Sequence, residues 1–201
     1  MRLTNGVVGI TFIILFSSAC THSVRPTGYL EKYDQLGPGH YLELFWSDPD
    51  RIVQGQYKRI VIGRIEARVV DSEKVTGEEA CKWLRYAVLG KSASSETLVL
   101  GGETGKTAKL DLAITEMTPG SAFARIMAGE LGAGHAWLQI EGYVTDEESS
   151  VLLVSFADRR RGSGAHGFRD VVGDSGPAMI GEGITAIGYD IRRELAREFG
   201  L

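Results

Sequence analysis

Cysteine is scarce in this sequence, whose 201 residues contain only Cys20 and Cys81. Two cysteines cannot form the set of several disulfides that holds many small secreted domains together. None of the four histidines stands at a spacing typical of metal ligands, so we expect neither a metal site nor a bound cofactor. A hydrophobic core must therefore hold the fold, and a chain of this length can build one.

Positive charge is also in short supply. The chain has 22 Lys and Arg residues against 26 Asp and Glu residues, and its formal net charge is −4. Binding to nucleic acid is driven by clusters of Lys and Arg that neutralise phosphates. We therefore expect no nucleic-acid partner.

No apolar run in the sequence is long enough to cross a membrane as a helix. The run from Val7 to Phe16 has only ten residues, whereas a helix needs about 20 to span a bilayer. This run follows the basic Arg2 and leads into the small residues Ser17, Ser18 and Ala19. A basic start, a short apolar segment and a small-residue exit are typical of a secretory signal peptide. We therefore predict that residues 1–19 are a signal peptide.

The residues at the exit, Ser17-Ser18-Ala19-Cys20, are similar to a bacterial lipobox. In that motif the chain is cleaved before the cysteine, here between Ala19 and Cys20, and the cysteine carries fatty acids such as palmitate. Leucine is the usual residue three positions before the cysteine, and Ser17 departs from that pattern. The alternative is an ordinary signal peptide that is cleaved nearby and leaves Cys20 as a free thiol. In the Gram-negative sorting rule an aspartate after the cysteine retains a lipoprotein in the inner membrane. Because Thr21 stands there, we expect the outer membrane, with the domain facing the periplasm.

Residues 20–40 are polar and contain several Gly and Pro residues, which predicts a lipidated N-terminus and tether. Four apolar residues within it are expected to lie against the domain: Tyr29, Leu30, Tyr33 and Leu36. Residues 41–201 are expected to form a single domain. In that domain Cys81 is predicted to be a half-buried small apolar residue on a helix, and the three tryptophans are predicted to be core residues.

Hydrophobic periodicity predicts the regular elements of this domain. Alternating patterns predict five strands, over residues 57–70, 97–100, 107–117, 134–146 and 150–160, of which the last two form a hairpin. Thr76 is a predicted helix N-cap, and apolar residues at spacings of three and four predict a second helix over residues 177–199. The elements predict an α+β fold: a two-layer sandwich with a mixed sheet of about five strands and two main helices packed on one face.

Two short motifs imitate functional sites. Gly105-Lys106-Thr107 resembles the end of a phosphate-binding loop, but a strand rather than a helix is predicted to follow, so we expect no nucleotide site. Gly-Asp-Ser-Gly-Pro around Ser175 resembles the nucleophile motif of chymotrypsin-like proteases, but the histidine context of that family is missing. We interpret Ser175 as the N-cap of the last helix, and we find no catalytic residues.

One cluster of positive charge stands out, Arg159-Arg160-Arg161 at the end of the last predicted strand. The simplest interpretation is a solvated strand end. The alternative is contact with an anionic envelope partner, such as a lipopolysaccharide phosphate or a peptidoglycan carboxylate.

Much of the mature chain resembles the Gram-negative lipoproteins grouped as domain of unknown function 3313 and the related domain of unknown function 4410. The stretches that carry the resemblance are TGYLEKYDQLGPG, YKRIVIGRIEARV, LDLAITEMTPG, GELGAGHAWLQIEGYVTD and GYDIRRELAREF. Members of these families often have aspartate followed by Thr-Gly-Glu in the hairpin turn, where this chain has Asp146-Glu147-Glu148-Ser149. The resemblance implies an outer-membrane or periplasm-facing lipoprotein with an α+β domain, and it implies no established catalytic residues.

The sequence therefore favours a lipid-anchored envelope lipoprotein that acts as a non-enzymatic interaction or accessory module. The expected partners are the membrane, through the lipid on Cys20, and an envelope protein or glycan that the sequence does not identify. The alternative function is an envelope hydrolase whose site the sequence does not reveal.

Overall fold

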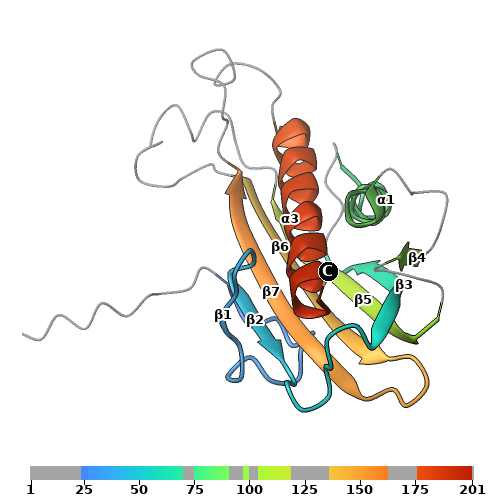
Figure 1. Ribbon diagram of the computed structural model, residues 1–201. Helices are drawn as coiled ribbons and strands as arrows, with labels where there is room; N and C mark the ends of the chain where they lie inside the picture. Colours follow the sequence, from blue (N-terminus) through green and yellow to red (C-terminus); the bar gives the residue numbers. More distant parts are fainter. Residues whose placement is uncertain are drawn as a thin grey trace, which may run out of the picture.

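In the part of the chain that the structure describes, one mixed β-sheet forms the framework, and two helices cover one of its faces (Figure 1). The computed structural model describes residues 24–69, 75–90, 97–99, 104–118, 136–162 and 176–200. The strands are β1 (Gly37–Pro38), β2 (Leu44–Ser47), β3 (Tyr57–Ala67), β4 (Thr97–Val99), β5 (Lys106–Thr118), β6 (Ala136–Asp146) and β7 (Leu152–Gly162). The described helices are α1 (Gly77–Leu89) and α3 (Gly176–Glu198).

The sheet is mixed, as predicted. Its strands follow the order β1-β2-β7-β6-β5-β3-β4. Among the described strands, β3 and β5 pair in parallel and the other neighbours are antiparallel. Parallel neighbours need a crossover connection, and α1 lies in the connection between β3 and β5. The α+β class and the β6–β7 hairpin are confirmed.

The predicted number of about five strands is wrong, because the described residues form seven. The two additional strands, β1 and β2, have two and four residues. Segments this short do not show an alternating pattern, and β1 lies within the predicted tether. Pairing with β7 makes β2 a strand: Leu44 lies opposite Ala157, and Phe45 lies opposite Phe156.

Helix α1 begins with the predicted cap. The Thr76 hydroxyl accepts a hydrogen bond from the backbone N–H of Glu79, and the Glu79 carboxylate accepts one from the backbone N–H of Thr76. This reciprocal pair is a capping box, which satisfies two N–H groups that the first turn leaves without partners. Cys81 is half-buried on this helix, packed against the core, and burial raises the pKa of its thiol. The predictions for Thr76 and Cys81 are confirmed.

Helix α3 buries the predicted apolar stripe. Its buried side chains are Ile180, Ile184, Ile187, Ile191, Leu195 and, just beyond its end, Phe199. They pack with α1 and with the inner residues of the sheet into one continuous core. The helix begins at Gly176, and Ser175, the predicted cap, lies outside the described residues.

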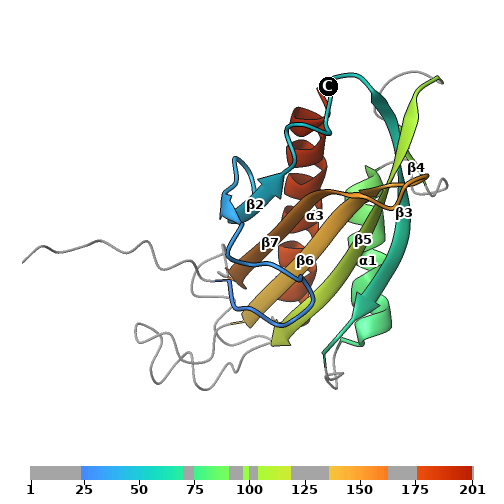
Figure 2. The same cartoon turned by 90° about the horizontal axis from the view of Figure 1, so that it is seen from below.

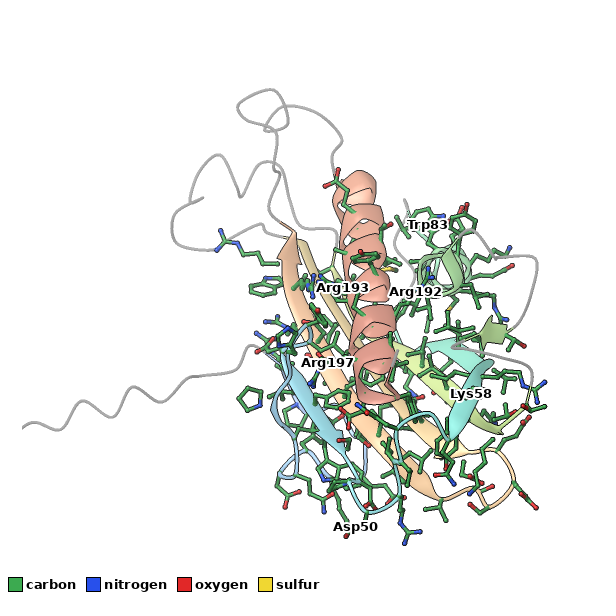
Figure 3. The ribbon with its side chains drawn as sticks, viewed as in Figure 1. Asp50, Lys58, Trp83, Arg192, Arg193 and Arg197 are labelled. Atoms are coloured by element: carbon green, nitrogen blue, oxygen red, sulfur yellow. The ribbon has the colours of Figure 1, made fainter. Side chains whose placement is uncertain are left out.

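The prediction that the three tryptophans are core residues is wrong. Trp83 is 38% exposed on α1 (Figure 3), and Trp46 and Trp137 are half-buried on the opposite side of the sheet. An apolar sequence context does not separate a core aromatic from one that lies at the surface. Trp46 lines a groove on that side of the sheet.

The centre of the sheet leaves no room for a side chain at Gly142. A Cβ atom there would meet the Phe156 ring and the Leu112 side chain. We therefore expect Gly142→Ala to lower the free energy of unfolding by about 1–3 kcal/mol, the usual cost of overpacking a core. Urea denaturation checks this value. Gly37→Ala is the matched control, because a Cβ at Gly37 meets nothing within 4 Å. Equal stability of Gly142→Ala and the wild type would contradict the close packing.

The β6–β7 turn is organised by one carboxylate. Asp146 accepts hydrogen bonds from the Ser149 backbone N–H (2.8 Å), the Ser149 hydroxyl (2.8 Å) and the Tyr57 hydroxyl (2.8 Å). The Lys106 ammonium lies 3.5 Å away. The Ser149 N–H first, then the Tyr57 hydroxyl, the Ser149 hydroxyl and Lys106, hold the pKa of Asp146 well below its usual range. Lys106 thus forms an ion pair with Asp146 of this turn. It begins strand β5, so a strand follows Gly105-Lys106-Thr107, as predicted, and not the helix that a phosphate-binding loop requires.

This lowered pKa predicts a pH dependence of stability. A carboxyl group whose pKa is lower in the folded state stabilises the fold above its unfolded pKa of about 4, and this stabilisation is lost as the pH falls further. We expect Asp146→Asn to be less stable than the wild type at pH 7, with a difference that shrinks below about pH 4. Urea denaturation at several pH values measures this, with the exposed Asp50→Asn as control. A difference that stays constant with pH would contradict this role of Asp146.

Candidate functional site

The N-terminal strap, which we define as residues 24–36, lies across the face of the sheet opposite the helices, the outer face (Figure 2). Tyr29 and Leu30 are buried there. They pack with three residues of the outer face, Leu44, Ala113 and Ala157. Tyr33 and Leu36 are partly buried against the same cluster. The predicted docking of these apolar residues is confirmed, and it produces a second, smaller hydrophobic cluster.

The start of the strap is held by a side-chain amide. Arg25 N–H donates to Gln139 Oε1 (2.9 Å), and Gln139 Nε2 donates to the Arg25 carbonyl (2.7 Å). One amide thus satisfies both backbone groups of one residue. Val24 N–H also donates to Glu43 Oε1 (3.2 Å). Gln139 is fully buried near the start of β6, so this contact fixes the strap to the middle strand of the sheet.

A buried carboxylate lies under the middle of the strap. Glu141 is fully buried. Its Oε1 accepts hydrogen bonds from Thr27 Oγ1 (2.6 Å), Thr115 Oγ1 (2.7 Å) and Gln139 Nε2 (2.9 Å). The Tyr33 hydroxyl donates to its Oε2. A buried carboxylate is costly unless hydrogen bonds satisfy it, and the strap supplies two of these four donors.

Arg159 is a buried structural residue, not part of a solvated strand end. Its guanidinium donates twice to Glu116, from Nε (2.6 Å) and from Nη2 (3.0 Å), and it lies 3.8 Å from the centre of the Trp137 ring. The hydrogen bond from Arg159 lowers the pKa of Glu116. A planar guanidinium suits both a bidentate carboxylate and an aromatic face. The solvated interpretation is therefore wrong for Arg159.

The three arginines of the predicted anion contact do not form one surface. Side chains alternate along a strand, so Arg159 faces the strap side while Arg160 faces the helices. Arg160 donates to Asp158 (2.6 Å) and to Asp190 of α3 (2.8 Å). Burial, opposed by Arg160, raises the pKa of Asp158. Arg161 is exposed. Contact with an anionic partner stays a prediction, and Arg159 and Arg160 already neutralise carboxylates within the chain.

A groove of about 590 Å³ opens between the strap and the outer face. Its residues come from the strap, β2, β6, β7 and the β6–β7 turn, and they include Tyr29, Leu30, Gln35, Trp46, Tyr143, Thr145, Ser150, Leu152 and Ser155. The sequence did not predict this groove, because Trp46 was assigned to the core and the strap was interpreted as a tether. The alternating polar and aromatic residues of β6 were the available signal.

Ala19 and Cys20, the predicted cleavage and lipidation residues, lie outside the described residues, as do the histidines His135 and His166. Within the described part of the chain, no group of three or more His, Cys, Asp and Glu side chains is arranged to hold a metal ion. Neither of the two described helices is long and apolar enough to span a bilayer.

The role of Glu141 is testable by hydrogen exchange. Glu141→Leu leaves the hydroxyl groups of Thr27, Thr115 and Tyr33 without their acceptor, so we expect the strap to detach. The backbone amides of residues 24–36 should then exchange at least about tenfold faster, which corresponds to about 1.4 kcal/mol of lost protection. The amides of α1 should exchange as in the wild type. The control is Glu148→Leu in the exposed turn. Unchanged protection of the strap in Glu141→Leu would contradict this role.

Comparison with known proteins gives fold-level similarities only. No family model and no curated protein matches the chain, so the resemblance to domains of unknown function 3313 and 4410 stays a prediction. The chain is similar to the PelC dodecamer from Paraburkholderia phytofirmans (11% identity, TM-score 0.39, 72% of this chain and 94% of that one). It is also similar to a Xanthomonas campestris protein of domain of unknown function 330 (12% identity, TM-score 0.42, 76% of this chain and 92% of that one). A third similar structure is a candidate lipoprotein from Caulobacter crescentus (10% identity, TM-score 0.32, 67% of this chain and 86% of that one). At such TM-scores we take no functional conclusion from these structures.

Proposed function

We propose that this chain is a lipid-anchored lipoprotein of the Gram-negative envelope and that it serves as a non-enzymatic interaction module. The observation that carries the proposal is the position of the first described residues. Arg25 follows Cys20, the proposed site of lipidation, by only five residues. Its backbone is hydrogen-bonded to the Gln139 side chain. The strap therefore acts as a mechanical link between the lipid and the sheet.

The short distance along the chain limits how far the domain stands from the membrane. A fully extended chain spans at most about 3.6 Å per residue. Five residues from Cys20 to Arg25 therefore reach at most about 18 Å. The end of the sheet where β6 begins and β7 ends is thus held close to the lipid, and the β6–β7 turn lies at the far end.

The lipid itself supports firm anchoring. One acyl chain binds a membrane only marginally, whereas two or more chains hold a protein stably. A mature bacterial lipoprotein carries a diacylglyceryl group on its cysteine, usually with a third chain on the amine. Thr21, in place of the aspartate that retains lipoproteins in the inner membrane, favours the outer membrane, with the domain facing the periplasm.

The polar residues of the outer face favour an interaction module over a hydrolase. Gln139 and Glu141 are used to hold the strap, and Arg159 is used to hold Glu116. Asp111 accepts a hydrogen bond from the Arg64 backbone N–H and lies 3.4 Å from Lys109. Each of these groups thus serves the fold itself, and a surface that binds a partner requires no catalytic acid or base.

The proposal is tested by the fate of Cys20. We expect intact-mass analysis of the wild type to give a mature chain that starts at Cys20 and carries a diacylglyceryl group, and we expect that chain in the outer-membrane fraction of a sucrose gradient. Cys20→Ala should lose the lipid, because its side chain cannot form the thioether bond. The variant should either stay uncleaved or be released into the periplasm.

Cys81→Ala is the matched control, because it removes the other thiol of the chain from a half-buried position on α1. It should keep the lipid and the membrane location. An unmodified thiol at Cys20 in the wild type, or a mature N-terminus elsewhere, would overturn the proposal.

A further inference from the structure

We propose that the groove between the strap and the outer face binds a neutral saccharide chain. The inference rests on the proposed function for its setting, since a module that faces the periplasm meets the glycans of the envelope. The lining residues on which the inference is based belong to the described part of the chain. Its ligand chemistry follows from the rings on its floor and the polar groups on its walls.

Two aromatic residues lie in one row across the floor. Ser155 of β7 is paired on one side with Trp46 of β2 and on the other with Tyr143 of β6. Neighbouring strands are about 4.8 Å apart, so the Trp46 and Tyr143 backbones lie about 10 Å apart. Two linked pyranose rings span such a distance. The apolar C–H faces of pyranose rings stack on aromatic faces, and both side chains are partly exposed.

The Tyr143 side of the floor is held in place before any ligand binds. The Tyr29 ring of the strap packs on Tyr143, with ring centres 5.6 Å apart and planes inclined by 33°. The Arg68 guanidinium lies 4.7 Å from the centre of the Tyr29 ring. A site whose rings are already fixed loses less conformational entropy on binding. The strap thus both closes the groove and orders it.

Polar groups surround the rings. The hydroxyls of Thr145, Ser150 and Ser155 and the amide of Gln35 line the groove. Hydroxyl and amide groups both donate and accept, which matches the hydroxyls and acetamido groups of sugars. Among the described residues of the lining, the charged side chains are Glu31 and Lys32, whose opposite signs balance and give no attraction for a phosphate.

Other ligand classes fit this lining less well. An acyl chain would cover polar groups and leave their hydrogen bonds unmade, which costs free energy. A saccharide satisfies the same groups and uses the rings as well. Small-molecule sites commonly combine an aromatic floor with a few placed polar groups.

The test uses the purified full-length mature protein in detergent micelles and the β-1,4-linked tetramer of N-acetylglucosamine as probe. We expect saturable binding by isothermal titration calorimetry, accompanied by a change in tryptophan fluorescence. Trp46→Leu should weaken binding by about tenfold or more, because it removes one stacking face. Trp83→Leu is the matched control, since Trp83 lies on the helix side of the sheet, and it should bind like the wild type.

A second variant guards against a folding effect of Trp46→Leu. Gln35 is exposed on the rim, so Gln35→Ala should leave the thermal unfolding transition unchanged and weaken binding by about threefold, the loss of one hydrogen bond. No binding of the tetramer to the wild type would overturn the proposal, as would an equal loss in Trp83→Leu. Displacement of the tetramer by inorganic phosphate or by lauric acid would also overturn it. The binding measurement does not involve Cys20. A failure to bind the tetramer therefore does not contradict the lipoprotein proposal, and an unmodified Cys20 does not contradict the saccharide proposal.

Discussion

The buried carboxyl group of Glu141 is the constraint on which the outer face depends. A buried carboxyl group must find hydrogen-bond donors, and two of the four donors to Glu141 come from Thr27 and Tyr33 of the strap. If the strap leaves, Glu141 loses half of its partners, and Tyr29 and Leu30 expose apolar surface. The cost of both losses favours the docked state. The strap is therefore part of the folded domain rather than a loose leader.

Docking of the strap gives the domain a direction. Its beginning is fixed at Gln139, and the groove extends to Thr145 on the same strand. Six residues of a strand cover about 20 Å. An anchor attached before residue 24 would therefore lie near one end of the sheet, with the groove toward the other. The interactions that hold the strap thus also set the distance between the membrane end and the groove.

Periodicity predicted the elements that have a long, one-sided pattern. The isoleucine stripe of α3 and the alternation of β5 left little choice, and Thr76 with Glu79 marked the start of α1. The strand β2 was missed because four residues cannot show a period, and its pairing with β7 is a tertiary effect. The seven-stranded sheet was therefore underestimated at one edge, where β1 and β2 are too short to show a pattern.

The groove and the Glu141 site could not be predicted, because their parts meet only after the sheet forms. Polar residues at alternate positions of β6 indicate a face toward water, and nothing local shows that residues more than one hundred positions earlier will cover Gln139 and Glu141. Arg159 was misjudged for the same reason, since Glu116 and Trp137 reach it from β5 and β6. A polar residue on an alternating strand is solvated only if that face stays open. In this protein the strap closes part of it, and the part left open beside Trp46 and Tyr143 becomes the groove.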